Sequence, residues 1–217
     1  MKNIIFIAPP GAGKGTQSKL VSSEYNIPHI STGDLLRYEV SKETELGKNI
    51  KNKIDNGMFV SDDIVLELIK NKISSPECAN GYILDGYPRN VDQAISYDKL
   101  LKDLNKDLGV VIFMDIDKDL ALERTVSRVI CPKCGSSYNL MAVKPKVNGI
   151  CDRCGSELKT RDDDNKETFL SRFETYIDKT SSLLEYYQDK GVLEKIEVEG
   201  KMTPTDVFDK IKEIIDK

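Results

Sequence analysis

The chain has 217 residues, a formal net charge of −4 and a hydrophobic content of 39%. This length and composition predict one large α/β domain, or a core with an insertion, that buries a hydrophobic core. The acidic balance excludes attraction of nucleic acid or of an anionic membrane by bulk charge. Because no export signal or bilayer-spanning apolar run is recognisable, we expect a cytoplasmic protein whose five cysteines favour metal over disulfides.

Apolar runs alternate with amphipathic stretches along the whole chain. The apolar runs predict strands at 4–7, 27–30, 82–84, 110–114 and 192–198. The amphipathic stretches predict helices at 16–25, 64–73, 92–104, 120–129 and 167–190. The sequence Thr203-Pro204-Thr205-Asp206 predicts a capping box that begins a last helix. This alternation indicates a doubly wound parallel sheet of five strands that binds its ligand at the carboxyl ends of the strands.

Two stretches interrupt this alternation. Residues 31–60 are polar, and the helical pieces within them are expected to break at Gly33, Gly47 and Gly57. Ser61 is then expected to cap the helix that follows. Residues 130–164 contain four cysteines with little helical periodicity. We interpret both stretches as candidate mobile flaps.

A glycine-rich loop directly follows the first predicted strand. It reads Gly11-Ala12-Gly13-Lys14-Gly15-Thr16 and precedes a predicted helix. Glycines let the backbone turn tightly and aim its N–H groups inward, and Lys14 is then placed to reach the outer phosphates of a nucleotide. The loop departs from the Walker pattern, since Ala8 stands at the usual first glycine and Gly15 precedes Thr16. The sequence therefore predicts a nucleotide phosphate site.

The cysteines form two knuckles with the spacing C-x2-C-x16-C-x2-C, made by Cys131, Cys134, Cys151 and Cys154. This spacing predicts a closed tetrahedral site with a structural metal, because four sulfur ligands leave no position for a reacting water. Zinc is expected, although iron also accepts four sulfurs. A nucleic-acid-binding ribbon is the alternative, but the knuckle region has Tyr138 as its one aromatic residue. Cys78 is expected to be an ordinary buried thiol.

A second signature, Asp85-Gly86-Tyr87-Pro88-Arg89, follows the third predicted strand. Asp85 is expected to hold Mg²⁺ directly or through water, and a simple turn is the alternative. Further arginines near the two flaps are predicted to donate to phosphoryl oxygens, and they are Arg37, Arg124, Arg128, Arg161 and Arg172. Since Arg124 and Arg128 are four residues apart, we expect them to share a helix face.

Several segments together resemble the adenylate kinases, of the long type whose lid carries a metal site. The matched segments are 10–17, 31–37, 84–89 with Gln93, 123–128 and 161–163. The resemblance covers essentially the whole chain. It implies a P-loop kinase core at 1–30, 61–126 and 165–217, an AMP-binding insertion at 31–60 and a lid at 127–164. The implied reaction is reversible phosphoryl transfer from MgATP to AMP, giving two ADP by direct in-line displacement, with structural Zn²⁺ in the lid.

The resemblance also implies roles for individual residues. ATP is expected to contact Gly11, Ala12, Gly13, Lys14, Gly15, Thr16, Arg124, Arg128, Ser137, Tyr138 and Met202. AMP is expected to contact Thr32, Arg37, Met58, Phe59, Val60, Gly86, Tyr87, Pro88, Arg89, Gln93, Arg161 and Arg172. The catalytic groups are expected to be Lys14, Asp85, Arg89, Arg124, Arg128, Arg161 and Arg172.

Two departures from the family pattern and several alternatives remain open. Ala8 is tolerable where its φ is negative, whereas Val129 replaces a frequent second arginine and puts the strength of lid closure in doubt. No catalytic role is expected for His29. A guanine-specific switch is suggested by the N-K-x-D sequence at 52–55, although this sequence lies in a polar helical stretch near the N-terminus and not after a late strand. Another base on the acceptor is also open. The expected partners are ATP, AMP and ADP, without nucleic acid or membrane, and we expect a monomer.

Overall fold

The computed structural model describes residues 3–55, 60–161 and 163–217. The chain divides into two compact units, and each contains segments that are distant in sequence. The first unit comprises Met1–Ile7, Ser18–Ile112 and Lys179–Glu194. The second comprises Ala8–Gln17, Phe113–Asp178 and Lys195–Lys217.

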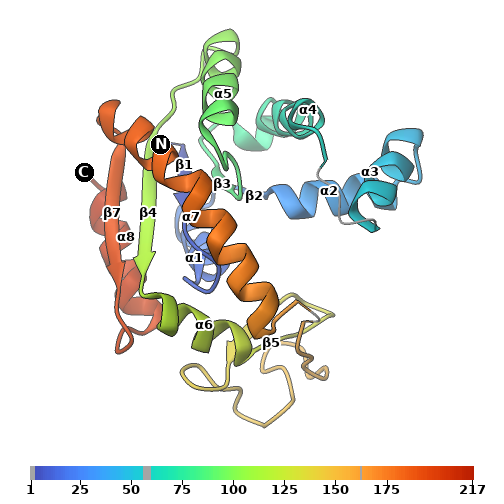
Figure 1. The fold of residues 1–217 in the computed structure, drawn as a ribbon, viewed down its shortest axis with the longest axis vertical. Coiled ribbons are helices and arrows are strands. Elements are labelled where there is room, and N and C mark those ends of the chain that lie inside the picture. Colours follow the sequence, from blue (N-terminus) through green and yellow to red (C-terminus); the bar gives the residue numbers. More distant parts are fainter. Residues whose placement is uncertain (1–2, 56–59, 162) are drawn as a thin grey trace. The chain divides into compact units, whose positions relative to one another are not determined.

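A five-stranded sheet has the order β2-β3-β1-β4-β7, which Figure 1 shows from right to left. Its strands are β1 (Ile4–Ile7), β2 (His29–Ser31), β3 (Ile83–Asp85), β4 (Val110–Ile116) and β7 (Leu193–Val198). β3 pairs in parallel with β1 and with β2, so that Asp85 faces Phe6 on one side and Ser31 on the other. The predicted parallel sheet of five strands with flanking helices is confirmed. β1 is the central strand, and the other strands are added on both sides of it. Right-handed crossover connections therefore place helices on both faces of the sheet.

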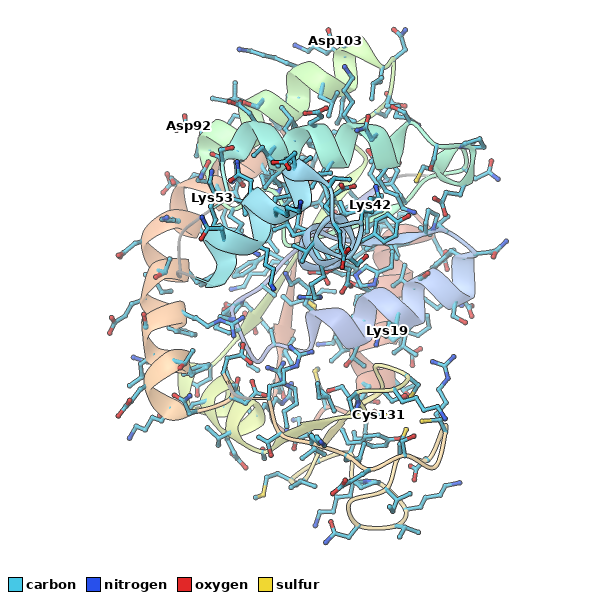
Figure 2. The ribbon with its side chains drawn as sticks, turned by 90° about the vertical axis from the view of Figure 1, so that its right-hand side faces the viewer. Lys19, Lys42, Lys53, Asp92, Asp103 and Cys131 are labelled. Atoms are coloured by element: carbon cyan, nitrogen blue, oxygen red, sulfur yellow. The ribbon has the colours of Figure 1, made fainter. Side chains whose placement is uncertain are left out.

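The first unit holds most of the apolar core. Its helices are α2 (Thr32–Ser41), α3 (Glu45–Asp55), α4 (Asp62–Ile73) and α5 (Val91–Asp103), with a 3₁₀ turn η1 (Pro76–Cys78). Figure 2 labels Asp92 and Asp103 near the two ends of α5. Ile4, Ile5 and Leu84 are fully buried in the adjacent strands, as continuous apolar runs in a parallel sheet require. Cys78 is also buried, as expected, and burial raises the pKa of its thiol.

The second unit contains α6 (Lys118–Val126), α8 (Pro204–Ile215) and a two-stranded antiparallel sheet of β5 (Arg128–Ile130) and β6 (Ser137–Asn139). Two helices, α1 (Lys14–Tyr25) and α7 (Lys166–Asp189), run from one unit into the other. Most predicted elements are confirmed with ends that differ by a few residues. The prediction of helix to residue 129 is wrong, because α6 ends at Val126 and residues 128–130 form β5.

The expected helix breaks at Gly33 and Gly47 are wrong, since both residues lie inside helices. Gly33 falls in the first turn of α2, where Ser31 accepts a hydrogen bond from the Asp34 N–H. Gly47 allows α3 to approach α2 closely, because a Cβ there would lie 2.4 Å from the Glu39 carbonyl oxygen. The break falls instead near Glu43, whose φ is +55°. Gly57 lies outside the described residues.

Within the described residues, no helix combines the length and apolarity needed to cross a bilayer.

The predicted capping box at the start of α8 is confirmed. The Thr203 hydroxyl accepts a hydrogen bond from the Asp206 N–H at 3.2 Å, and the Asp206 carboxylate accepts one from the Thr203 N–H at 2.7 Å. Two N–H groups that α8 itself leaves without partners are thereby satisfied.

Replacing Thr203 with alanine removes the hydroxyl of this box, so we expect the free energy of unfolding to fall by about 1 kcal/mol. Urea denaturation measures the change. Thr205→Ala is the matched control, because Thr205 is exposed in the first turn of the same helix and lies outside the box. Equal losses for the two variants would contradict the capping role.

Candidate functional site

The glycine-rich loop, Gly11–Thr16, lies in the second unit and is pressed against α6. Gly11 has a φ of +85°, and a Cβ there would lie 2.3 Å from the Ala121 carbonyl oxygen and 2.8 Å from Thr125 Oγ1. Only glycine fits such a position, because both the left-handed backbone and the contact exclude a side chain. The loop therefore turns tightly before α1, as the sequence predicts.

The end of the loop passes directly into α1. The Thr16 and Gln17 N–H groups donate to the Gly13 carbonyl oxygen at 2.9 Å and 3.1 Å, so helix geometry begins at Lys14. The Gln17 amide donates to the Pro204 carbonyl oxygen at 2.9 Å, which ties this first turn to α8. The φ of Ala8 is not positive, so alanine is tolerated at this position, where the Walker pattern usually has its first glycine.

The expectation that Arg124 and Arg128 share a helix face is wrong. The Ser127 N–H donates to the Glu123 and Thr125 carbonyl oxygens and ends α6 between the two arginines. The Arg124 guanidinium donates to the Glu199 carbonyl oxygen at 3.3 Å, and burial lowers its pKa. Arg128 instead begins β5, where strand pairing rather than helix geometry sets its direction.

Two adjacent carboxylates hold two of the predicted arginines. Arg128 Nε donates to Asp164 Oδ2 at 2.8 Å, and its Nη2 donates to the other carboxylate oxygen. The Asp164 side chain is fully buried, so the bidentate pairing compensates its charge. Arg172 Nη1 lies 2.6 Å from Asp163 Oδ2 on the surface. The Asp164 N–H also donates to the Arg161 carbonyl oxygen at 3.1 Å.

A second cluster of predicted residues lies in the first unit, around Gly86. Thr32 Oγ1 donates to the Gly86 carbonyl oxygen at 3.0 Å, and Arg89 Nε donates to the same oxygen at 2.9 Å. Gly86 has a φ of +84°, and a Cβ there would lie 2.7 Å from Thr32 Oγ1. The cluster therefore depends on a glycine directly after β3.

Side chains that flank Gly86 have defined partners. Gln93 Oε1 accepts a hydrogen bond from the Arg89 N–H at 2.7 Å, and Gln93 Nε2 donates to Asp62 Oδ1 at 2.7 Å. Tyr87 is buried, and its hydroxyl donates to the Gln93 carbonyl oxygen at 3.1 Å. The Tyr87-Pro88 peptide bond is cis.

The Asp85 carboxylate, which the sequence predicts as a magnesium ligand, has a partner at the start of β2. His29 Nε2 and Asp85 Oδ2 are 3.0 Å apart, and both side chains are largely shielded from solvent. In the parallel register His29 lies opposite Ile83, two residues before Asp85 on the neighbouring strand, so its ring reaches along β3 to the carboxylate. Sequence reasoning did not foresee it, because the two residues are 56 positions apart.

Four further predicted residues lie on α2, on β6 and in the segments before α4 and α8. Arg37, on α2, pairs with Asp34 one turn earlier in the same helix. The Met202 N–H donates to the Glu199 carbonyl oxygen at 3.1 Å in the turn before α8. Ser137 is exposed on β6, and Val60 directly precedes Ser61. Met58 and Phe59 lie outside the described residues.

The four cysteines of the two knuckles meet in the second unit, and Figure 2 labels Cys131 among them. All four sulfurs lie within 4.8 Å of one another, with Cys131 and Cys154 at 3.4 Å and Cys134 and Cys151 at 3.5 Å. Tetrahedral zinc with Zn–S bonds of about 2.3 Å requires sulfurs about 3.8 Å apart. The cluster fits such an ion.

The two knuckles repeat one local geometry. The Gly135 N–H donates to the Cys131 carbonyl oxygen at 2.9 Å, and the Gly155 N–H donates to the Cys151 carbonyl oxygen at 2.8 Å. Each turn brings its two sulfurs to the same side, so two turns supply four ligands. The prediction that these four cysteines form one metal-ligating group is supported by this convergence.

Tyr138 connects β6 to the second knuckle. Its hydroxyl lies 3.5 Å from Cys151 Sγ and accepts a hydrogen bond from the Asp152 N–H at 2.8 Å. The contact with Tyr138 lowers the pKa of Cys151, whereas burial raises the pKa of Cys131. Val129 packs against the same cluster, so the position that departs from the family pattern is part of a small apolar core.

Comparison with known proteins gives one consistent result. Residues 6–192 match a protein family described as adenylate kinase. The adenylate kinase of Clostridium tetani (strain Massachusetts / E88) is 42% identical over 213 residues, covering 98% of each chain. That of Archaeoglobus fulgidus is 44% identical over 215 residues, covering 99% of this chain and 98% of the relative. That of Oceanobacillus iheyensis is 43% identical over 215 residues, covering 99% of each.

Removing one ligand tests the metal cluster. Wild-type protein is expected to contain about one equivalent of zinc or iron, and Cys151→Ser is expected to lose it. We expect Tm to fall by roughly 5–10 °C, or ~2–3 kcal/mol at this chain length, because three ligands no longer hold the two knuckles together.

Metal analysis and thermal denaturation measure both effects. Cys78→Ala is the control, since Cys78 is buried outside the cluster and its removal leaves all four ligands in place. Wild-type protein that contains no metal after purification without chelators would overturn the assignment.

Proposed function

This chain belongs to the adenylate kinase family, and we propose that it transfers the terminal phosphoryl group of MgATP reversibly to AMP, giving two ADP. The observation that carries the proposal is the glycine-rich loop, where Gly11 has a left-handed backbone and packs without a side chain against α6. Such a loop at the start of a helix binds phosphate through backbone N–H groups. The reaction would keep the adenine nucleotides in balance.

On the ATP side, we assign phosphate binding to the loop and contacts with the remaining nucleotide to the second unit. Lys14 follows the turn that Gly13 makes, which supports its role as the cation for the outer phosphates. The other assigned ATP-binding residues are Gly11, Ala12, Gly13, Gly15, Thr16, Arg124, Arg128, Ser137, Tyr138 and Met202.

On the AMP side, we assign binding to the cluster around Gly86. The hydrogen bonds that fix Arg89 at both its backbone N–H and its Nε support a role in orienting the acceptor. The other assigned AMP-binding residues are Thr32, Arg37, Met58, Phe59, Val60, Gly86, Tyr87, Pro88, Gln93, Arg161 and Arg172.

We propose direct in-line transfer. An oxygen of the AMP phosphate attacks the γ-phosphorus of ATP, the bond to the bridging β,γ oxygen breaks, and ADP leaves with that electron pair. The attacking phosphate is already ionised near neutral pH, so no general base is needed. Lys14, Arg89, Arg124, Arg128, Arg161 and Arg172 stabilise the charge on the transferring group.

The magnesium ion arrives with ATP and neutralises charge on its phosphates. Asp85 would hold it directly or through water, and its carboxylate suits this hard cation. The hydrogen bond from His29, if the ring donates, restricts the rotation of that carboxylate. The role of His29 is then to orient Asp85 rather than to move a proton.

Zinc, when bound by Cys131, Cys134, Cys151 and Cys154, supplies a structural cross-link and no reacting position. We propose the division into a core (1–30, 61–126 and 165–217), an AMP-binding insertion (31–60) and a lid (127–164), with both flaps closing to exclude water. The cytosol suits this chain, because thiolates bind metal only while they stay reduced. A monomer without nucleic-acid or membrane partners remains our prediction.

The guanine-specific alternative has weak support, because its N-K-x-D residues belong to α3, on which Figure 2 labels Lys53. A guanine loop is expected after a strand instead. Incubation with ADP and Mg²⁺, followed by chromatography, tests the proposal. Formation of equal ATP and AMP, with AMP preferred over GMP, CMP and UMP as acceptor, is expected. Phosphate release without transfer would indicate a hydrolase and overturn it.

We expect Lys14→Met and Arg89→Ala each to raise the barrier to transfer by about 3–4 kcal/mol, because each removes a donor that stabilises the transition state. The effect is measured as kcat/KM for ATP and AMP, with Tm as a check of folding. Lys19→Met is the control, since Lys19 is exposed further along α1, where Figure 2 labels it. Near wild-type rates for either active-site variant would remove its assigned role.

A further inference from the structure

The amide of Gln93 lies between two groups of opposite hydrogen-bonding character. Its Oε1 accepts from the Arg89 N–H and its Nε2 donates to Asp62 Oδ1, both at 2.7 Å. Gln93 is 9% exposed, so water competes little for either bond. Asp62 is the first residue of α4 and lies 31 positions before Gln93 in the sequence.

These partners leave the amide one orientation. A peptide N–H can only donate, and an ionised carboxylate can only accept. Turning the amide over would bring its NH₂ against the Arg89 N–H and its oxygen against the Asp62 carboxylate. Both bonds would then be replaced by repulsive contacts, and a hydrogen bond to a charged group is among the stronger ones in proteins.

The groups that hold the amide are themselves fixed. Asn90 Oδ1 accepts from the Gln93 N–H at 2.9 Å and caps α5, and the Tyr87 hydroxyl donates to the Gln93 carbonyl oxygen. Asp62 lies in the first turn of α4, where the helix dipole favours a carboxylate. Ser61 is the N-cap residue of α4, as the sequence predicts, but its side chain makes no capping hydrogen bond. Asp62, the next residue, connects this helix start to Gln93.

The amide keeps one N–H and one oxygen lone pair for a ligand. Adenine offers a donor at its exocyclic nitrogen beside a ring acceptor, whereas guanine offers an acceptor oxygen beside a ring N–H donor. The phosphate and ribose fix the position of the base. The orientation of the amide therefore decides whether its donor and acceptor match those of the base. An amide free to turn would accept both bases.

We propose that Asp62 is a positioning residue that selects adenine over guanine in the monophosphate acceptor, by holding the Gln93 amide in one orientation. The inference rests on the proposed function, with Gln93 facing the AMP base. Asp62 acts through Gln93 and does not itself touch the nucleotide.

Asp62→Asn tests this role, because an asparagine side chain donates as well as accepts and so releases the amide. We expect the ratio of kcat/KM for AMP to that for GMP to fall about tenfold, mainly through a higher KM for AMP, which matches the loss of one charged hydrogen bond. The KM for ATP should stay unchanged. Asp63→Asn is the matched control, since it removes the same charge from the same helix turn, and Asp63 has no bond to Gln93 in the described part of the chain.

A double-variant cycle separates positioning from a general structural effect. In a Gln93→Ala background, Asp62→Asn should change the AMP to GMP ratio less than twofold, because the group through which it acts is gone. Asp62→Ala should reproduce the loss of selectivity if the asparagine variant does not fold. An unchanged ratio in both Asp62 variants, or an equal change in Asp63→Asn, would overturn the inference while leaving the kinase activity standing. Wild-type protein that transfers no phosphoryl group to AMP would overturn both proposals.

Discussion

Two candidate binding regions, the glycine-rich loop and the cluster around Gly86, each depend on a glycine with a left-handed backbone that follows a strand of the sheet. After β1, Gly11 lets the loop pack against α6, where a Cβ would lie 2.3 Å from a carbonyl oxygen. After β3, Gly86 turns its carbonyl oxygen toward Thr32 and Arg89. At each position a side chain would displace neighbouring groups that the binding region requires. The backbone conformation of these two glycines is therefore a precondition for the positions of the charged residues.

Two of the predicted cations are held by ion pairs within the second unit. The chain is acidic overall, and two neighbouring carboxylates keep these two cations in defined positions. Arg128 is bound bidentately by buried Asp164, and Arg172 is paired with the neighbouring Asp163. A guanidinium already fixed in this way loses little side-chain freedom when it binds an anion, which lowers the entropic cost of binding.

The cysteine-bearing part of the second unit has too little apolar material to fold by burial alone. Its buried cluster consists of Cys131, Cys151 and Leu158, with Val129 and Tyr138 among the residues packed around it. Small cores of this kind usually need a metal or cross-links for stability. The metal ligands are thus also the core, and Val129 contributes to that core where a second arginine would carry charge.

The sequence by itself determined the features that depend on neighbouring residues. The glycine-rich loop, the two cysteine knuckles and the capping box at Thr203 each form from residues a few positions apart, so their geometry follows from local rules. The alternation of strands and helices predicted the sheet for the same reason. The resemblance to a known family assigned the nucleotides, and the comparisons support that family over nearly the whole chain.

Only the tertiary structure decided which distant side chains share a hydrogen bond. Spacing placed Arg124 and Arg128 on one helix face, whereas the chain leaves α6 between them to pair β5 with β6. A glycine at position 47 predicts a helix break, whereas α3 continues through it and packs closely on α2. The contacts of His29 with Asp85, of Arg128 with Asp164 and of Gln93 with Asp62 join elements far apart in sequence. Helix and strand propensities depend on residues that are close in sequence, so they do not predict such contacts. These contacts form only when packing brings separate elements together.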